Sequence, residues 1–334
     1  MQFDHLNRRE IISLLSGATV AWPLTARAQK GERVRRVGVL MNLAAGDAEG
    51  ETRFAAFLQG LQELGWAVGR NVRIETRWGT GDVEFYRTNA AELIALAPDV
   101  ILASGTPATM ALKRATRTIP IVFANANDAV GAGLVESLAR PGGNATGFTG
   151  FEYGMSVKWL ELLRQIAPGI VRVAVLRDPM TPLGMASFGA IQSAAPALRV
   201  ELRPIDVHDV EEIERAVAAF AVGPNGGLIV PPTALAILHR KPIIALAAQH
   251  RLPAIYAYRS FVSDGGLIAY GPDLVPQFRS AAGYVDRILK GEKPGDLPVQ
   301  APVKYYTVIN LKTAKVLGLD LPASVLATAD EVIE

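Results

Sequence analysis

Short apolar runs alternate with longer amphipathic stretches along the chain from residue 35 onward. The apolar runs have the length and the branched side chains of buried strands. The stretches between them carry apolar residues on one helical face and end near glycine or proline. The predicted strands are residues 35–42, 71–78, 99–104, 119–125, 171–176, 200–205, 227–230, 253–258, 267–271 and 305–310. The predicted helices are residues 53–64, 84–96, 107–115, 133–138, 156–166, 186–195, 210–220, 234–250, 276–289 and 311–322.

This order predicts an α/β fold with two Rossmann-like lobes, each a parallel sheet covered by helices. The first series of elements leads out through residues 144–151, and the second begins with helix 156–166. Ligands of open α/β sheets bind beyond the carboxyl ends of the strands. The candidate ligand-binding residues at strand ends are Asn42, Ser104, Gly105, Thr106, Asn125, Asn127, Asp128, Asp178, Pro231, Tyr258 and Tyr270.

One strand end has an unusual composition. The strand at 99–104 runs into Ser104-Gly105-Thr106, and Pro107 lies just inside the next predicted helix. The start of a helix leaves backbone N–H groups free, and together with the two hydroxyls they form a site for a carboxylate or phosphate. The alternative is that Thr106 serves only as the N-cap of the helix.

Carboxylates and tyrosines at other strand ends also allow two interpretations. Asp128 and Asp178 would bind an ammonium group or act as an acid/base pair, or they cap loops. Tyr258 and Tyr270 lie on consecutive strand ends, close in sequence to Tyr256. Such tyrosines would form the walls of an aromatic pocket, or they pack a seam between the lobes.

The N-terminus has the features of a secretory signal peptide. Arg8-Arg9 precedes an apolar stretch of about 14 residues, which ends in Ala26-Arg27-Ala28. We expect cleavage after Ala28, and the arginine pair is compatible with the twin-arginine export route or the ordinary one. The 334-residue chain has no cysteine, so disulfides, thiolate metal sites and a cysteine nucleophile are excluded. Its net charge is +2. We expect a periplasmic protein that is a monomer and has no nucleic-acid partner.

Motifs of common catalytic sites are absent from the sequence. It contains no phosphate-binding G-x-x-x-x-G-K-[ST], no G-x-G-x-x-G and no G-x-S-x-G. The four histidines lack metal-binding spacing, and His5 is lost with the predicted signal peptide. We therefore expect a binding protein with no cofactor, no metal and no enzymatic activity.

Several segments resemble the substrate-binding components of ABC transporters, in the family that includes tryptophan-binding proteins. They are "FLQGLQELGWAVGRNVRIETRW", "APDVILASGTPATMALK", "IPIVFANANDAVGAGLVESLARPGGNATGFTG" and the long stretch from "GGLIAYGPDLVPQF" to "VINLKTAKVLGLDLP". The resemblance spans residues 35–322, and its most specific pieces are "GLIAYG", "RILKGEKP" and "VINLKTAK".

The resemblance implies a type I periplasmic-binding-protein fold, in which the chain crosses a three-segment hinge and the lobes close around a small ligand. It places the crossings near 148–154, 260–266 and 299–304. Lobe 1 would then comprise residues 34–150 and 265–299, and lobe 2 residues 151–264 and 300–334.

The resemblance also implies roles for individual residues. The turn Ser104-Gly105-Thr106 matches one that faces the ligand carboxylate in amino-acid-binding members. Asn127-Asp128 matches an Asp-Pro corner at the cleft, although Ala129 stands where proline is usual. Tyr258 and Tyr270 fall at cleft-lining positions, and Phe151 is a further candidate for an apolar wall.

The leading hypothesis is an exported protein that binds a small carboxylated solute, aromatic or amino-acid-like, and delivers it to ABC permease subunits in the inner membrane. A second hypothesis is a ligand sensor that docks on a signalling receptor. A third is an exported hydrolase or isomerase that uses Asp128 or Asp178. A fourth, a cytoplasmic repressor of similar fold, requires an N-terminal helix-turn-helix, where this chain has a signal peptide instead.

Overall fold

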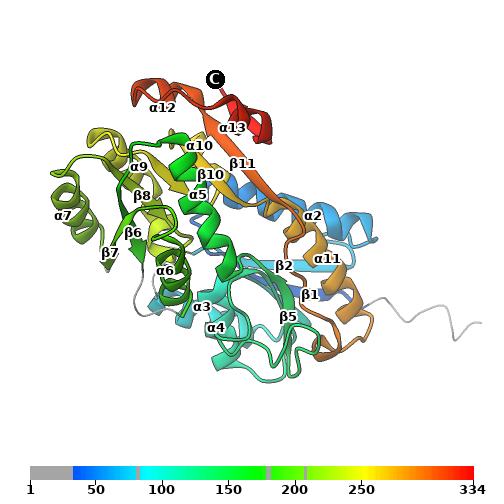
Figure 1. The fold of residues 1–334 in the computed structure, drawn as a ribbon. Helices are drawn as coiled ribbons and strands as arrows, with labels where there is room; N and C mark the ends of the chain where they lie inside the picture. Colours follow the sequence, from blue (N-terminus) through cyan, green and yellow to red (C-terminus); the bar gives the residue numbers. More distant parts are fainter. Residues whose placement is uncertain (1–32, 80–82, 178–181, 207–208) are drawn as a thin grey trace, which may run out of the picture.

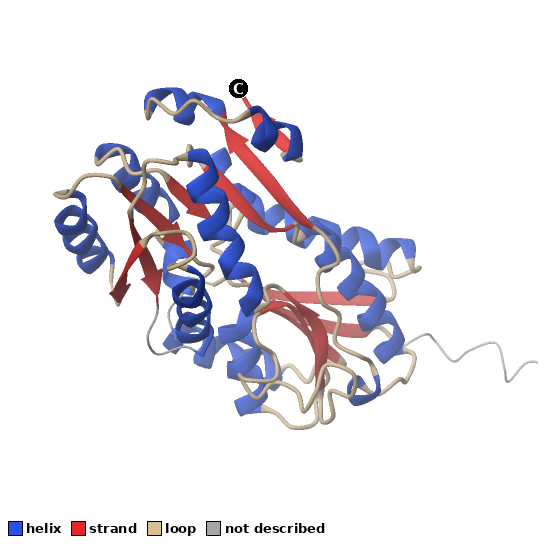
Figure 2. Ribbon diagram, in the orientation of Figure 1, coloured by secondary structure: helices blue, strands red, loops and turns tan. Residues whose placement is uncertain are grey.

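Two separate sheets organise the chain in the computed structural model, which describes residues 33–79, 83–177, 182–206 and 209–334 (Figures 1 and 2). The predicted signal peptide, residues 1–28, lies outside the described residues, as does Asp178. The predicted α/β fold with two lobes is confirmed, because each sheet consists mostly of parallel strands with helices packed against it.

The first sheet has five described strands in the order β2-β1-β3-β4-β5, all parallel. Helices α2 and α11 pack on one face, and α3 and α4 on the other. Its strands are β1 (Arg35–Leu40), β2 (Val72–Arg77), β3 (Val100–Ser104), β4 (Ile121–Ala126) and β5 (Ala145–Thr149). Its helices are α2 (Ala48–Glu63), α3 (Val83–Ala95), α4 (Gly105–Ala115) and α11 (Val275–Leu289), and the short η2 (Pro294–Asp296) lies near β5.

The second sheet has seven described strands in the order β12-β11-β10-β9-β8-β6-β7, and only the β10–β11 pair is antiparallel. Its strands are β6 (Arg172–Arg177), β7 (Glu201–Asp206), β8 (Gly226–Val230), β9 (Ala254–Tyr256), β10 (Ile268–Pro272), β11 (Tyr305–Asn310) and β12 (Glu331–Ile333). Its helices are η1 (Tyr153–Met155), α5 (Ser156–Ile166), α6 (Pro182–Ala194), α7 (Val210–Ala221), α8 (Ala234–Leu238), α9 (Arg240–Gln249), α10 (Arg259–Ser263), α12 (Leu311–Val316) and α13 (Ala323–Thr328).

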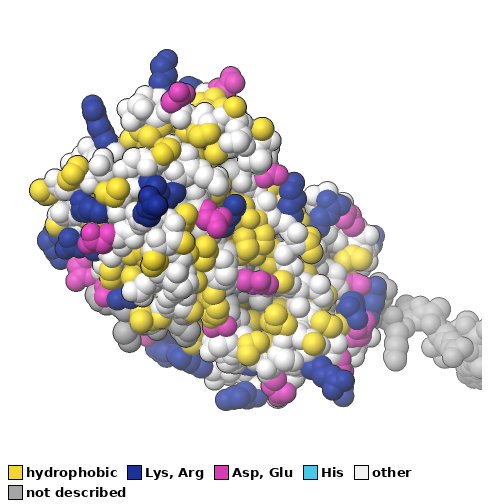
Figure 3. All heavy atoms as spheres, viewed as in Figure 1, with side chains coloured by type: hydrophobic (Ala, Val, Ile, Leu, Met, Phe, Trp, Pro, Cys, Tyr) yellow, Lys and Arg dark blue, Asp and Glu magenta, His cyan; other side chains and the backbone are white. Residues whose placement is uncertain are grey.

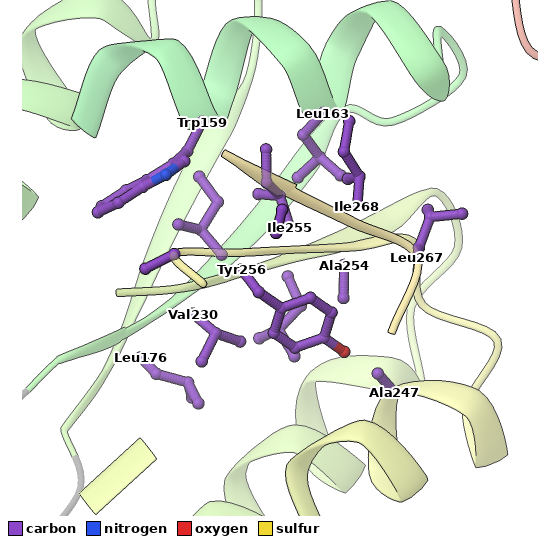
Figure 4. Packing of buried hydrophobic residues seen from close by; sticks show 14 of the residues in the cluster. Trp159, Leu163, Leu176, Val230, Ala247, Ala254, Ile255, Tyr256, Leu267 and Ile268 are labelled. Atoms are coloured by element: carbon purple, nitrogen blue, oxygen red, sulfur yellow. The ribbon is translucent and has the colours of Figure 1, made fainter. Parts of the chain in front are cut away.

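The core of the second lobe forms on both faces of this sheet. Figure 4 shows Trp159 and Leu163 of α5 on one side of the central strands and Ala247 of α9 on the other. Tyr256 of β9 points toward α9 and is 1% exposed. Burial on both faces explains why these strands are continuous apolar runs in the sequence.

Two predicted helices are wrong, and a third, predicted at 311–322, ends at Val316. Residues 133–138 form turns and bends, because the N–H groups of Leu134 and Val135 both bond to the carbonyl oxygen of Ala129 and that of Glu136 bonds forward to Pro141, so no run of bonds to the fourth residue back develops. The helix predicted at 234–250 divides at His239 into α8 and α9. Pro242 lies in the first turn of α9, where its ring would clash with the carbonyl group of Leu238 in a continuous helix.

One expected lobe crossing also differs. Residues 265–272 were expected in lobe 1, after a crossing near 260–266. In the structure β10 pairs with β9 and β11, so the chain stays in the second sheet as far as Pro272. It then passes to the first lobe before α11 begins at Val275. Strand pairing between distant segments decides this boundary, and local composition does not reveal it.

Candidate functional site

The carboxyl ends of β1 and β3 are joined by polar side chains. The hydroxyl of Ser104 donates to Oδ1 of Asn42 over 2.6 Å, and Ser104 is fully buried. Gly105 follows with a φ of +81°, and a Cβ there would lie 3.2 Å from Nδ2 of Asn42. The position thus requires glycine for its backbone conformation. The candidate residues Asn42, Ser104 and Gly105 therefore lie together, and the Ser104 hydroxyl is bonded within the protein.

The Thr106 hydroxyl joins the first turn of α4 to the residue that follows β4. It accepts from the N–H of Asn127 over 2.9 Å and donates to the carbonyl oxygen of Asn127 over 3.1 Å. Thr106 is not the N-cap, because α4 begins at Gly105 and Ser104 occupies the cap position without a side-chain cap bond. Both hydroxyls of this turn are therefore bonded within the protein.

Two asparagines at the end of β4 form the centre of the site. Oδ1 of Asn127 accepts from the backbone N–H of Phe151 over 2.9 Å. Asn125 has a φ of +58°, and its Oδ1 accepts from the hydroxyl of Tyr258 over 3.1 Å. Gly150 leaves the space they need, since a Cβ there would lie 2.2 Å from Oδ1 of Asn125 and 2.5 Å from Oδ1 of Asn127.

Tyr258 brings the second lobe to this group. It follows β9, immediately before α10, and is 3% exposed. Burial raises the pKa of Tyr258 to about 12, although the nearby Arg53 opposes this effect. The phenol therefore stays protonated and can donate to Asn125 at neutral pH. The Tyr258–Asn125 hydrogen bond links the carboxyl ends of strands in the two different sheets.

Phe151 is the centre of an aromatic cluster where the chain passes between the lobes. Its ring centroid lies 5.5 Å from those of Tyr258 and Trp159, and 6.3 Å from that of Tyr305. Tyr270 joins only the outer part of this cluster. It stacks on Tyr305 at 5.8 Å, and its carbonyl oxygen accepts from Trp159.

Asp128 and Pro231 each bond to a nearby backbone N–H group, and Asp128 also contacts Tyr153 of η1. Oδ1 of Asp128 accepts from the N–H of Gly131 over 2.9 Å, which forms a turn. Burial and a hydrogen bond to the Asp128 carboxylate raise the pKa of Tyr153 above its ordinary value. Pro231 is buried after β8, and its carbonyl oxygen accepts from the N–H of Thr233 over 2.8 Å.

The sequence reasoning missed four charged residues beside Tyr258 and the start of α2. Arg53 of α2 is 2% exposed, and its Cζ lies 5.7 Å from the centroid of the Tyr258 ring. It forms an ion pair with Glu49. Arg240 of α9 pairs with Asp47 over 3.2 Å and lies 3.9 Å from Glu49, so this contact also joins the lobes.

A signal for Arg53 is visible in hindsight. The position lies three and four residues before Ala56 and Phe57, which form the buried face of α2. A charged residue on the apolar face of a helix is rarely buried without a partner. The prediction started the helix at residue 53, whereas α2 begins five residues earlier behind the capping carboxylate of Asp47.

A hollow in the second lobe lies away from this group of residues. A cavity of about 610 Å³ opens at the amino ends of β6, β8 and β9, lined by residues such as Pro168, Asn225 and Arg251. This is the end of the second sheet opposite the candidate site. Among the described residues, no group of three or more His, Asp or Glu side chains is arranged to hold a metal ion. No helix in the described ranges is long and apolar enough to cross a membrane.

Comparisons with known proteins agree with this architecture. The profile of the ABC transporter substrate binding protein family matches residues 37–333. A tyrosine-binding protein of Clostridioides difficile is 28% identical over 264 residues, covering 79% of this chain and 75% of the relative. More distant solute-binding structures share the fold.

Two solved structures are informative about the lobes. An ABC domain from Streptococcus pneumoniae in complex with L-Trp is 25% identical and has a TM-score of 0.82 over 90% of this chain and 99% of that one. A ligand-free, open substrate-binding protein with adhesive properties from Clostridium difficile is 24% identical, with the same coverage of 90% and 99% but a TM-score of 0.67. The family match covers most of the chain, so the chain belongs to the ABC transporter substrate-binding protein family.

Proposed function

We propose that the chain is the extracytoplasmic component of an ABC transporter and captures a small carboxylated, amino-acid-like or aromatic ligand between its two lobes. The observation that carries this proposal is the meeting of Asn125 and Tyr258, which come from the two sheets. Side chains from both lobes that meet at strand ends form a site only when the lobes close. The names of the tyrosine-binding relative and the L-Trp complex support an aromatic amino acid.

The chemistry of the converging residues fits such a ligand. Phe151 and Tyr258 present ring surfaces, which bind aromatic or apolar side chains. Asn125 and Asn127 offer amide groups that hydrogen-bond polar groups. Ring surfaces together with a small number of placed polar and charged groups are typical of a pocket for a small molecule.

Closure is the step that couples capture to transport. The higher TM-score to the L-Trp complex than to the open structure supports a closed arrangement in this structure. Closed lobes would present a surface that permease subunits distinguish from the open one. The family is one of solute-binding proteins, which is why we propose no catalytic step.

The proposal is tested by measuring the Tm of the purified protein in the presence of each of a panel of amino acids, aromatic acids, nucleosides and sugars. A ligand present at 100 times its Kd adds about 2.7 kcal/mol to the free energy of unfolding and raises the Tm by several degrees. We expect aromatic amino acids to give the largest shifts. A shift only with sugars or nucleosides would retain the capture role and overturn the carboxylated ligand. Turnover of the bound compound, measured by chromatography, would contradict the proposal that the chain is not an enzyme.

A further inference from the structure

Arg53 has buried donors without acceptors. Its Nη2 pairs with Glu49 one turn earlier in α2. Its Nε and Nη1 are buried and have no hydrogen-bond partner among the described residues. One N–H on Nε and two on Nη1 therefore lack an acceptor in that part of the protein. Within the same residues, the other buried side-chain atom in this situation is Oε1 of Gln277 in α11.

Burying the N–H groups of Arg53 without acceptors lowers the stability of the fold unless another group accepts their hydrogen bonds. Buried polar groups in proteins are nearly always hydrogen-bonded, and a buried cation needs such partners more than a neutral group does. Glu49 balances the charge of Arg53 but is bonded to only one of its nitrogens. An acceptor from outside the chain would satisfy the others.

The guanidinium lies beside the candidate site. Its Cζ is 5.7 Å from the centroid of the Tyr258 ring, and the hydroxyl of Tyr258 donates to Asn125. Arg53 thus reaches the meeting point of the two lobes from α2. A ligand held between these lobes would be next to its unpartnered nitrogens.

The other candidate for binding a carboxylate is the turn Ser104-Gly105-Thr106, whose hydroxyls already form hydrogen bonds within the protein. At the start of α4, the hydroxyl of Ser104 donates to Asn42, and that of Thr106 bonds to the backbone of Asn127. Those hydroxyls are therefore not free for a ligand carboxylate, whereas the donors of Arg53 are.

We propose that Arg53 binds the carboxylate of the captured ligand, an inference that rests on the proposed function. A planar guanidinium matches a carboxylate with parallel hydrogen bonds. Glu49 beside it disfavours a ligand with net negative charge, because a second unbalanced carboxylate would be repelled. The ligand class is therefore a zwitterionic amino acid rather than a simple acid.

Isothermal titration calorimetry tests this with L-tyrosine, L-tryptophan and their carboxamides, which keep the size of the ligand but lack its negative charge. In the wild-type protein we expect the amino acids to bind far more tightly than the amides. In Arg53→Gln we expect the amino acids to bind about 30- to 3,000-fold more weakly, as for truncation of a buried charge pair. The affinity of the amides should change much less, so the preference for the acid largely disappears.

The controls separate this inference from the proposed function. Arg279→Gln alters an exposed arginine of α11 that pairs with Glu63, and should leave both affinities unchanged. Arg53→Lys keeps the charge and covers the case in which Arg53→Gln does not fold, and it should retain part of the acid preference. Wild-type protein that binds neither L-tyrosine nor L-tryptophan would overturn the aromatic amino-acid ligand on which this inference rests, whereas the capture role itself is decided by the unfolding panel.

Two outcomes would overturn the role of Arg53 alone. One is an Arg53→Gln variant that binds amino acids with an undiminished preference over the amides. The other is a Thr106→Pro variant that loses this preference while Arg53→Gln keeps it, which would assign the carboxylate to the start of α4.

Discussion

Tyr258→Phe removes one hydrogen bond that joins the two lobes. The hydroxyl of Tyr258 lies 3.1 Å from Oδ1 of Asn125, and both residues are buried. Phenylalanine keeps the ring and its 5.5 Å contact with Phe151. The variant therefore loses the hydrogen bond and leaves the amide oxygen of Asn125 without this donor. Such a loss costs about 1–3 kcal/mol.

This cost falls on lobe closure, because the donor and the acceptor belong to different lobes. A closed state weakened by about 1–3 kcal/mol is less populated by about 5- to 150-fold relative to the open one. Ligand binding that requires closure should weaken by up to the same factor. Calorimetric titration with the ligand identified by the unfolding panel measures the Kd, and thermal unfolding measures stability with and without ligand.

Tyr256→Phe is the matched control. Tyr256 is also buried, but it stacks on Phe261 at 4.9 Å inside the core of the second lobe. We expect Tyr256→Phe to change the Tm without changing the Kd, and Tyr258→Phe to change the Kd. An unaltered Kd in a folded Tyr258→Phe protein would refute the role of this hydrogen bond in closure, as would equal losses of affinity in both variants.

Three other predictions follow from the structure. Arg240→Gln breaks the 3.2 Å ion pair with Asp47 between the lobes, so ligand affinity should fall several-fold and depend less on salt, measured by titrations at two ionic strengths. Gly271→Ala should lower the Tm by several degrees, because its Cβ would lie 1.8 Å from a carbonyl oxygen of the neighbouring segment. Gly283→Ala in α11 is the control, because the new Cβ would have no described atom within 4 Å apart from the local backbone of its own helix, and its Tm should match or exceed that of the wild type. Equal losses of Tm in the two variants would contradict the packing described for Gly271. A backbone N–H and a lysine hold the pKa of Asp330 below its ordinary value of 3.8. The ionised Asp330 carboxylate therefore contributes to the free energy of unfolding above about pH 4, and this contribution is lost as the pH falls below that value. The Tm of Asp330→Asn should lie below that of the wild type at pH 7 and approach it in acid.

Local sequence pattern determined most of the secondary structure. The strand at 305–310 and the helix at 156–166 have the predicted bounds, because their apolar positions follow a period of two or of 3.6 residues. Chain order then implied parallel sheets, and parallel sheets place strand ends together. Asn125, Asn127 and Tyr258 are candidates from the sequence because each lies at or near the end of a predicted strand, and their role in binding stays a prediction.

Tertiary structure alone decided which partners these residues have. The sequence could not reveal that the hydroxyls of Ser104 and Thr106 are bonded within lobe 1, since their partners lie 62 and 21 residues away. Nor could it place Arg53 against Tyr258, about 200 residues distant in the chain. Periodicity is a local property that assigns each residue to a face of its own element. Burial of a charge between two lobes depends on what the other lobe brings to that face, and only the folded chain determines that.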